Sequence, residues 1–460
     1  MPPRFRTRAS IARLRRASIG AYPLWGGRLL FLFGGICVGL AAVLMARCAD
    51  AAQVGFKALV GVSPLAALVV TPAGFALAAL LARTVFPNSQ GSGIPQVIAA
   101  RHTRDPGFRH RLISLRVAFG KIVVMTLGLA CGASSGREGP TVQVGAAIMA
   151  AVGRLTPDRL PGLILAGGAA GVAAAFNTPL AGIVFGIEEL GRAYEPRSSG
   201  LIVAGIVAAG LTSLWLVGNY TYFGTSDVTL PLGEGWLVVV VLGAAGGFAG
   251  GVFSRLVILF ARGLPGRAGR LIARHPIAFA GLCGLGVALA GLASGGSVYG
   301  TGYEEAKALL HGEALLHGDT TARLDFAPLK FCATALSAIS GIPGGLFAPS
   351  LAVGAGLGGM LQDAFPNVPI GALVLTGMVA YLAGVLQAPI TAFVIVTEMT
   401  QDHAMMIPLM IAAVLADAAS KTVCRTGLYH TLAEIMLARA EPAPDAARIK
   451  GAPAPGGGNG

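Results

Sequence analysis

Long apolar runs, separated by short polar segments, dominate the chain. They lie at 29–45, 65–85, 112–133, 163–187, 201–217, 236–260, 277–293, 331–360, 370–396 and 405–416. Several exceed the ~20 residues that cross a bilayer. Gly and Pro interrupt many of them, and broken backbone is tolerated at membrane depth only where protein or a water-filled cavity surrounds it. The pattern predicts an all-α integral membrane protein of tilted, broken transmembrane helices, some of them half-helices that meet at a site.

The chain also contains an internal repeat. Residues 140–146 resemble 349–355 position for position, and 177–184 resemble 387–394. In each half an acid follows the second proline by nine residues, at Glu188 and Glu398. Duplicated, broken segments at corresponding places are typical of a binding site near the membrane midplane. The spacing alone leaves open whether the two repeats are parallel or inverted.

These patterns define the expected organisation. A basic N-terminal segment spans 1–23 and a single transmembrane domain spans 24–436, with repeats at about 24–195 and 230–432. The acidic stretch 304–325 is expected to be an aqueous loop. The tail 437–460 is rich in Pro, Gly and Ala, and we expect it to be disordered.

Composition supports a membrane protein and excludes several classes. Hydrophobic residues make up 54% of the 460 positions and charged residues only 12%, against ~25% in soluble domains. A cytosolic enzyme, a disordered protein and a secreted disulfide scaffold are therefore excluded. The net charge of +13 includes an arginine-rich N-terminus with no acid before Asp50, which predicts a cytoplasmic N-terminus and no nucleic-acid partner. Cysteines and histidines are scattered, so we expect no metal and no cofactor.

Three short segments share one design, in which small residues precede a proline and an apolar run. They are 91–95 (GSGIP), 136–140 (GREGP) and 344–349 (GGLFAP). Proline suits the first turn of a helix, glycine lets an anion approach the backbone N–H groups, and each helix N-terminus carries roughly half a positive charge. Partial charges bind and release an anion, whereas a buried lysine or arginine is costly at membrane depth. Tight turns that only pack helix against helix are the alternative.

Glu138 stands out within the second segment. An unpaired carboxylate at the head of an apolar run is expensive, but a carboxylate is itself an anion and can occupy an anion site. Deprotonated it competes with a bound anion, and protonated it can swing aside. A salt bridge with a basic neighbour is the alternative interpretation.

The three segments, in this order, resemble the CLC family of chloride channels and proton-coupled chloride transporters. Residues 173–182 and 427–429 resemble the same family, and the likeness extends over roughly 24 to 435. It implies a CLC-like fold of two inverted repeats and a homodimer with one pore per subunit. It also implies chloride as the bound ligand, held by the hydroxyls of Ser92 and Tyr429 and by the backbone N–H groups of Gly345, Leu346 and Phe347.

The resemblance also implies roles for the ionisable residues. Glu138 corresponds to the gating glutamate that receives the external proton. Glu189 corresponds to the internal proton-transfer glutamate and Glu188 to its companion, although a purely structural pair stays open. Lys121 corresponds to a buried lysine that offsets negative charge in the pore. Glu398 is expected to be structural, and Asp417 has no assigned role.

Two features near the proposed pore refine the resemblance. Serine at 92 favours chloride over nitrate and fails to match the fluoride-exporting branch. Gln96 stands where many relatives carry glutamate, and we expect this substitution to tune function without abolishing it.

The main hypothesis is therefore chloride/proton exchange, with a passive voltage-gated chloride channel of the same fold as the alternative. An intramembrane enzyme is disfavoured because no nucleophile–base or metal arrangement is found. A transporter of organic substrates would need a larger polar pocket. As in bacterial relatives, the expected location is the inner (plasma) membrane, with chloride, protons and the lipid bilayer as partners.

Overall fold

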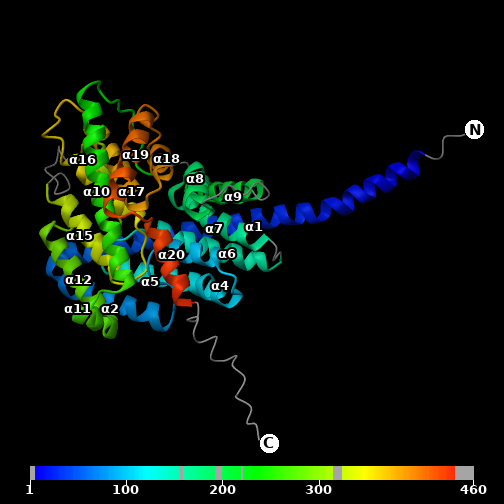
Figure 1. Ribbon diagram of the computed structural model, residues 1–460, viewed down its shortest axis with the longest axis horizontal. Helices are drawn as coiled ribbons and strands as arrows, with labels where there is room; N and C mark the ends of the chain where they lie inside the picture. Colours follow the sequence, from blue (N-terminus) through cyan, green and yellow to red (C-terminus); the bar gives the residue numbers. More distant parts are fainter. Residues whose placement is uncertain (1–5, 156–158, 192–198, 219–220, 314–323, 441–460) are drawn as a thin grey trace, which may run out of the picture.

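The computed structural model describes residues 6–155, 159–191, 199–218, 221–313 and 324–440 (Figure 1). Within these ranges every regular element is a helix, and β-type pairing is confined to two isolated bridges. The first half contains α1 (Arg6–Val62), η1 (Pro64–Ala66), α2 (Ala67–Thr84), α3 (Ile94–His102), α4 (Pro106–Leu112), α5 (Leu115–Ala130), α6 (Glu138–Val152), η2 (Gly153–Leu155), α7 (Leu160–Phe176), α8 (Pro179–Phe185), the π-helix η4 (Gly186–Gly191) and α9 (Ser199–Val217). The second half contains α10 (Glu234–Arg262), α11 (Gly266–Arg274), α12 (Pro276–Ala293), α13 (Tyr303–Leu310), α15 (Phe326–Ile339), α16 (Phe347–Gly359), α17 (Ile370–Leu386), α18 (Pro389–Thr400), α19 (Met406–Val423) and α20 (Leu428–Ala440).

The repeat seen in the sequence is also a structural repeat. Helices α5 to α9 correspond in order to α15 to α19, at an offset of about 210 residues. In the first half Gly145 of α6 crosses Gly167 of α7 so closely that a Cβ on either would meet the other's carbonyl oxygen. Gly354 of α16 and Gly377 of α17 make the same crossing in the second half. Small residues allow such close helix packing in membranes.

The two repeats are inverted with respect to each other. Arg83 at the C-terminal end of α2 lines the same cavity as Pro276 at the N-terminal end of its counterpart α12. Pro64, next to the N-terminal end of α2, lines a second cavity together with Leu292 at the C-terminal end of α12. The two corresponding helices therefore run in opposite directions, which confirms the inverted arrangement that the resemblance implies.

Two carboxylates mark the axis between the repeats. Glu398 of α18 accepts hydrogen bonds from the backbone N–H groups of Leu180 (3.1 Å) and Ala181 (2.7 Å) in the first turn of α8. Glu188 of η4 accepts from Ile390 (3.1 Å) and Thr391 (2.6 Å) in the first turn of α18. Each carboxylate thus caps a helix of the other repeat in the same way. Reciprocal contacts of this kind define a local two-fold axis.

The long apolar runs correspond to helices, several of them broken as predicted. Within the described residues, six helical segments are long and apolar enough to cross a membrane. The run at 163–187 divides into α7, α8 and part of η4, and Asn177 ends α7 with a left-handed φ of 57°. The run at 370–396 divides in the same way at Gln387, with a φ of 55°. A single left-handed residue ends a helix because the next N–H can then satisfy its last carbonyls.

Two expected boundaries need correction. The stretch 304–325 begins inside helix α13, where Glu305 and Leu309 are buried, so its first part is not an aqueous loop. Helix α20 continues to Ala440, four residues into the predicted tail, and 441–460 lies outside the described residues. Helix α1 begins at Arg6, so most of the basic segment 1–23 is continuous with the first membrane helix (Figure 1).

Candidate functional site

Three helix N-termini meet where the sequence predicts an anion site. They belong to α3, α6 and α16, each with a proline in or near its first turn. The loops before them are joined by backbone hydrogen bonds. Gly91 donates to Ile342 (3.1 Å) and accepts from Gly344 (3.2 Å), and Gly136 and Gly345 donate to each other's carbonyls at 2.8 and 2.7 Å. This pairing fixes the three N-termini against one another, so their partial positive charges add at one point.

Glycine is required where these loops touch. A Cβ on Gly139 would overlap the hydroxyl of Ser92, and a Cβ on Gly136 would overlap Oε2 of Glu138. Gly93 has a φ of 101°, which other residues rarely adopt. The missing side chains leave space for the Ser92 hydroxyl and the Glu138 carboxylate at the N-terminus of α6.

The Glu138 carboxylate is buried where an anion would bind. Its side chain is 0% exposed and lies beside the backbone N–H groups of Arg137, Glu138 itself and Ala348, the last in the first turn of α16. Neither carboxylate oxygen has a hydrogen-bond partner in the described part of the chain. Arg137 forms an ion pair with Asp50 of α1, with 2.7 Å between Nη1 and Oδ1. Arg137 also acts on the Glu138 carboxylate through its charge.

Two neutral hydroxyls reach the same region. Ser92 and Tyr429 are 8% and 0% exposed, and their hydroxyls face each other, with no other partner for either one among the described residues. The Tyr429 ring stacks on Phe347, with 6.5 Å between ring centroids, and Phe347 in turn packs on Phe185 at 5.8 Å. Because buried hydroxyls in native structures nearly always have partners, two such groups beside three helix N-termini indicate a site for an acceptor.

The three predicted backbone donors at the start of α16 differ in whether their N–H groups already have an acceptor. The N–H groups of Leu346 and Phe347 lie at its first turn, where a helix offers no internal acceptor. The N–H of Gly345 already donates to the carbonyl of Gly136. Gly345 therefore joins two loops, and its role as a chloride ligand stays a prediction.

Lys121 acts on the site through the backbone. It is fully buried, and its Nζ donates to the carbonyls of Ser89 (2.7 Å), Gly91 (2.7 Å) and Gln90 (3.3 Å). These three residues form the loop that leads into Ser92. The charge of Lys121 is therefore spread over the carbonyls of the loop that carries the serine.

Sequence reasoning missed the second buried lysine. Lys330 of α15 is also fully buried, and its Nζ donates to the carbonyls of Val298 and Gly300, both at 2.9 Å. These three residues stand 209 positions after Lys121, Ser89 and Gly91, so the repeat offset could have revealed the pair.

The loop of the second half that corresponds to the Ser92 loop is closed by a side chain of the protein itself. Thr301, which corresponds to Ser92, donates from its backbone N–H (3.0 Å) and its hydroxyl (3.2 Å) to Oε1 of Gln53 on α1. The flanking glycines, Gly300 and Gly302, keep the left-handed conformation of their counterparts. An intramolecular acceptor therefore fills the second loop, whereas the hydroxyl of Ser92 in the first loop faces the phenol of Tyr429.

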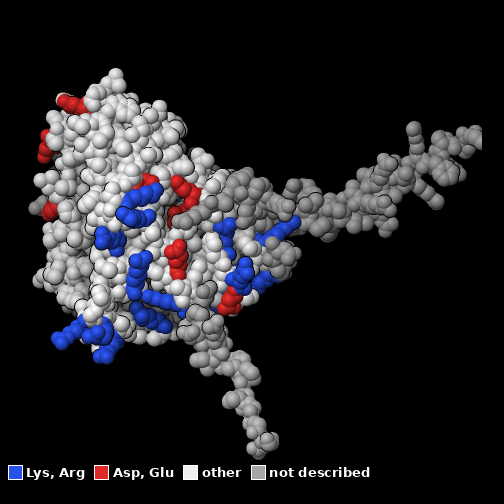
Figure 2. All heavy atoms as spheres, viewed as in Figure 1, with Lys and Arg blue, Asp and Glu red and all other residues white. Residues whose placement is uncertain are grey.

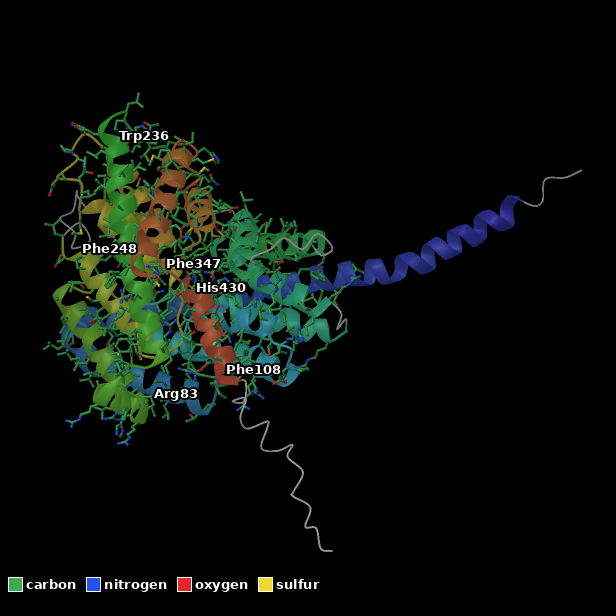
Figure 3. The ribbon with its side chains drawn as sticks, in the orientation of Figure 1. Arg83, Phe108, Trp236, Phe248, Phe347 and His430 are labelled. Atoms are coloured by element: carbon green, nitrogen blue, oxygen red, sulfur yellow. The ribbon has the colours of Figure 1, made fainter. Side chains whose placement is uncertain are left out.

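The adjacent acids Glu188 and Glu189 point to different partners. Glu188 caps α18, as described above. Glu189 is 3% exposed, and His430 of α20 lies against it: Nε2 of His430 is 2.9 Å from the Glu189 carbonyl oxygen and 3.7 Å from Oε1. Tyr429, the residue before His430, is within electrostatic reach of both Glu138 and Glu189. Figure 3 shows His430 on α20. His430 was also missed, and its position beside Tyr429 in the sequence is the signal that could have indicated it.

Cavities approach the site from two sides. A cavity of about 510 Å³ is lined by Ser92, Gln96, Leu346 and Arg83. A cavity of about 360 Å³ on the other side is lined by Arg137, together with Thr301 and Glu305.

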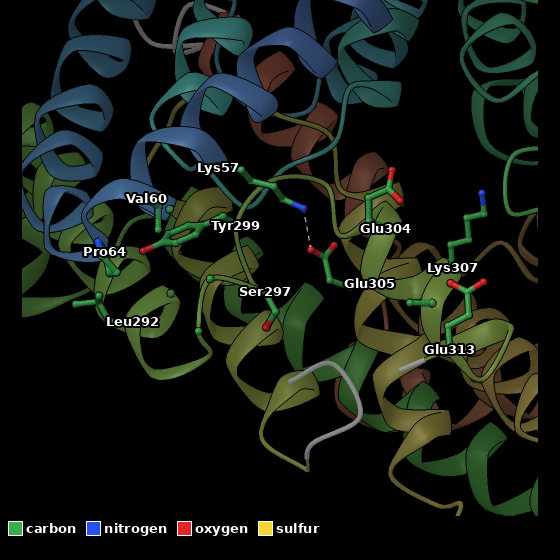
Figure 4. Close-up of a pocket in the computed structure, with 15 residues that line it drawn as sticks. Lys57, Val60, Pro64, Leu292, Ser297, Tyr299, Glu304, Glu305, Lys307 and Glu313 are labelled. Carbon is green, nitrogen blue, oxygen red and sulfur yellow. Dashed lines mark hydrogen bonds and ion pairs between the residues drawn. The ribbon is translucent and has the colours of Figure 1, made fainter. Parts of the chain in front are cut away.

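Beyond it lies a cavity of about 830 Å³, and Lys57, Glu304 and Glu305 line both. The ion pair of Lys57 and Glu305, at 3.1 Å, crosses between the two cavities (Figure 4). Away from all three cavities, Asp417 pairs with Lys421.

Comparison with known proteins finds a matching family and similar relatives. Residues 74–421 match the family described as voltage gated chloride channel. The chain is 31% identical over 440 residues to the H(+)/Cl(−) exchange transporter ClcA of Yersinia pseudotuberculosis serotype IB (strain PB1/+), covering 89% of this chain and 87% of that one. ClcA of Yersinia pestis bv. Antiqua (strain Angola) has the same identity and coverage.

Solved structures share the fold. A slow cyanobacterial Cl−/H+ antiporter superposes with a TM-score of 0.73 at 24% identity, covering 89% of this chain and 99% of that one. A eukaryotic CLC transporter superposes with a TM-score of 0.71 at 22% identity, covering 90% of this chain and 74% of that one.

Proposed function

Because this chain belongs to the voltage-gated chloride channel (CLC) family, we propose that it is a membrane antiporter that exchanges chloride for protons. Its exchange-transporter relatives support antiport over passive conduction. The observation that carries the mechanism is the buried, unpaired carboxylate of Glu138 between the N-termini of α6 and α16. Ionised, it satisfies the helix N-termini and blocks the anion. Protonated, it loses its attraction to them and leaves the position to chloride.

Chloride is held in this proposal by partial charges alone. The hydroxyls of Ser92 and Tyr429 donate from two sides, and the N–H groups of Leu346 and Phe347 donate from the start of α16. No lysine or arginine needs to touch the ion, because Lys121 acts through the carbonyls of the Ser92 loop. Binding by neutral donors is reversible, which transport requires, and the cavity beside Ser92 gives the ion access from one side.

The proton follows a partly separate route. Glu138 takes it up from the cavity that Arg137 lines. Glu189 takes it up on the other side of Tyr429, with Glu188 as its companion toward water. The burial of Glu189 supports this role, because a buried carboxylate without a task would be a cost to folding.

We also propose that two copies associate through the face that contains α8 and α18. The axis between inverted repeats lies in the membrane plane, so Glu188 and Glu398, which mark it, lie near the bilayer midplane. Both carboxylates are half-buried, and contact between an ionised group and lipid at that depth costs about 3 kcal/mol. Leu180 and Ile390 beside them are 56% and 51% exposed. A second copy would cover both the charges and the apolar surface.

The charges on the two sides support a cytoplasmic N-terminus and an inner-membrane location. Basic side chains gather on the side of α4, α11 and α20, and acidic ones lie both among them and at the opposite end, where α10 begins (Figure 2). Arg267, Arg270 and Arg274 of α11 are exposed on that basic side. The basic side of a membrane protein faces the cytoplasm. Lys57 near the end of α1 lies at the cavity of Arg137, so α1 begins on the basic side.

The test measures proton movement driven by chloride. The full chain is purified and placed in liposomes with an outward chloride gradient and no pH gradient, and potassium with valinomycin holds the voltage near zero. External pH is then recorded. Alkalinisation as chloride leaves, abolished by a protonophore, is the expected result. Chloride efflux without any pH change would contradict exchange and establish a channel.

Two variants test the assigned residues. Glu138→Ala is expected to keep chloride flux and to lose its coupling to protons, because the gate no longer carries a proton. Glu304→Gln is the matched control, since this exposed acid lines the outer cavities away from the helix N-termini, and it should keep coupling. A folded Glu138→Ala protein without chloride flux would contradict the gate assignment.

A further inference from the structure

His430 is a titratable side chain at the inner proton site that the mechanism above does not use. Its side chain is 11% exposed and that of Glu189 is 4% exposed. Nε2 of the imidazole is 2.9 Å from the carbonyl oxygen of Glu189 and 3.7 Å from its Oε1. The two residues come from different repeats, on α20 and η4, and meet beside Tyr429.

The surroundings of Glu189 suit a mobile proton. Glu189 lies in η4, a π-helix, and such turns are frequent at functional sites. Nε2 reaches the carbonyl oxygen at hydrogen-bond distance but stands farther from Oε1 than a hydrogen bond allows. A small rotation of the carboxylate would close this gap, so the geometry permits both a separated pair and a hydrogen-bonded one.

Resting on the exchange function proposed above, we propose that His430 and Glu189 form one inner proton site that loads near neutral pH. An isolated carboxyl group binds its proton with a pKa of about 4.3, and an imidazole binds one with a pKa of about 6.5. Two groups in contact titrate as a pair, so the first proton taken up by the pair follows the more basic member. His430 therefore lets the site accept a proton at a pH where the carboxylate alone stays empty.

The transfer step balances within the pair. A proton from water converts neutral imidazole and carboxylate into imidazolium and carboxylate. The Nε2–H bond then breaks as the Oε1–H bond forms, leaving neutral imidazole and a neutral carboxylic acid. Glu189 passes this proton toward Tyr429 and Glu138, and the pair returns to its starting charge.

Other charged groups lie on the elements that carry the pair or pack near it. Glu188 lies on η4 itself, Glu398 on α18, and Glu434 on α20. Arg101 of α3 donates to the carbonyl of Leu190 at 2.7 Å, and Arg255 lies on α10. None of these side chains is a histidine, so a step between pH 5 and 8 that is present only with His at position 430 reports the pair.

The test compares His430→Gln and His430→Ser with the unmodified chain in liposomes, at symmetric pH from 5 to 8. At pH 7.5 proton flux should fall about tenfold in both variants, because the carboxylate alone loads poorly there. At pH 5 proton flux should recover, and chloride flux in the same vesicles should stay within about twofold throughout. His102→Gln on α3 is the matched control and should leave the profile unchanged.

Two results would overturn the proposal. Wild-type proton flux at pH 7.5 in His430→Gln, whose amide keeps a donor near Nε2, would show that the ring only positions Glu189. Loss of proton flux at every pH in both variants would show a structural role. Failure of the exchange function itself is distinguishable, because the unmodified chain would then move chloride without protons.

Discussion

The reciprocal caps of Glu188 and Glu398 allow a structural role to be separated from a proton role. Replacing either residue by glutamine removes the negative charge and one of two acceptor oxygens at the start of a helix. Each carboxylate accepts two backbone hydrogen bonds, at 3.1 and 2.6 Å for Glu188 and at 3.1 and 2.7 Å for Glu398. Because the two-fold axis makes the sites equivalent, the two substitutions cause nearly the same local damage.

The size of the damage follows from these contacts. A hydrogen bond to a charged group contributes about 1.5–3 kcal/mol, and loss of a helix cap costs about 0.5–2 kcal/mol where water competes. For two bonds to a half-buried carboxylate we expect a loss of about 2–4 kcal/mol. A chain of 460 residues has an unfolding entropy of about 1 kcal/mol per kelvin. The melting temperature should therefore fall by about 2–4 °C in either variant.

Function should then distinguish the two residues. Thermal unfolding of the purified protein in detergent gives the change in Tm, and liposome flux gives the proton-to-chloride ratio. We expect Glu188→Gln and Glu398→Gln to lose similar stability, while only Glu188→Gln lowers the ratio. The same proton-to-chloride ratio in Glu188→Gln and Glu398→Gln would show that Glu188 is a helix cap and no proton carrier. A Tm that falls in one variant alone would refute the two-fold argument.

Two further substitutions test the packing around the site. Gly139→Ala should reduce chloride flux more than tenfold, because a Cβ there overlaps the Ser92 hydroxyl and displacing one such donor costs roughly that much; Gly55→Ala, which meets no atom within 4 Å, is the control and should leave flux unchanged. Lys57→Met should lower the free energy of unfolding by about 1–3 kcal/mol, because it leaves the buried carboxylate of Glu305 unpaired. Adding Glu305→Gln should restore most of it, and additive losses in the double variant would contradict a direct pair.

Much of the architecture could be predicted from the sequence because its signals are local. Apolar length gives the helices, and glycine and proline mark where the long runs break. The segments around 91–95, 136–140 and 344–349 were expected to begin helices, and α3, α6 and α16 begin there. Such features depend on neighbours within a few residues, which the sequence displays directly.

The contacts that complete the site join residues far apart in the chain. Gly345 was predicted to be an anion donor like its neighbours, but its N–H donates to the carbonyl of Gly136. His430 meets Glu189 from 241 positions away, and Gln53 fills the Thr301 loop from 248 positions away. Local propensity says nothing about such pairs, since they depend on how helices pack once the repeats have folded against each other.

The repeat explains why one half carries the binding site and the other does not. Lys121 and Lys330 hold equivalent loops through equivalent carbonyls, so the duplicated scaffold is the same on both sides. What differs is one acceptor: the Gln53 amide oxygen engages Thr301, whereas the hydroxyl of Ser92 faces the phenol of Tyr429 and, among the described residues, no amide oxygen. An inverted repeat with two free loops would bind an anion at two depths. With one loop closed internally, we expect the proposed anion site to be confined to the side of Ser92, next to the proposed gate of Glu138.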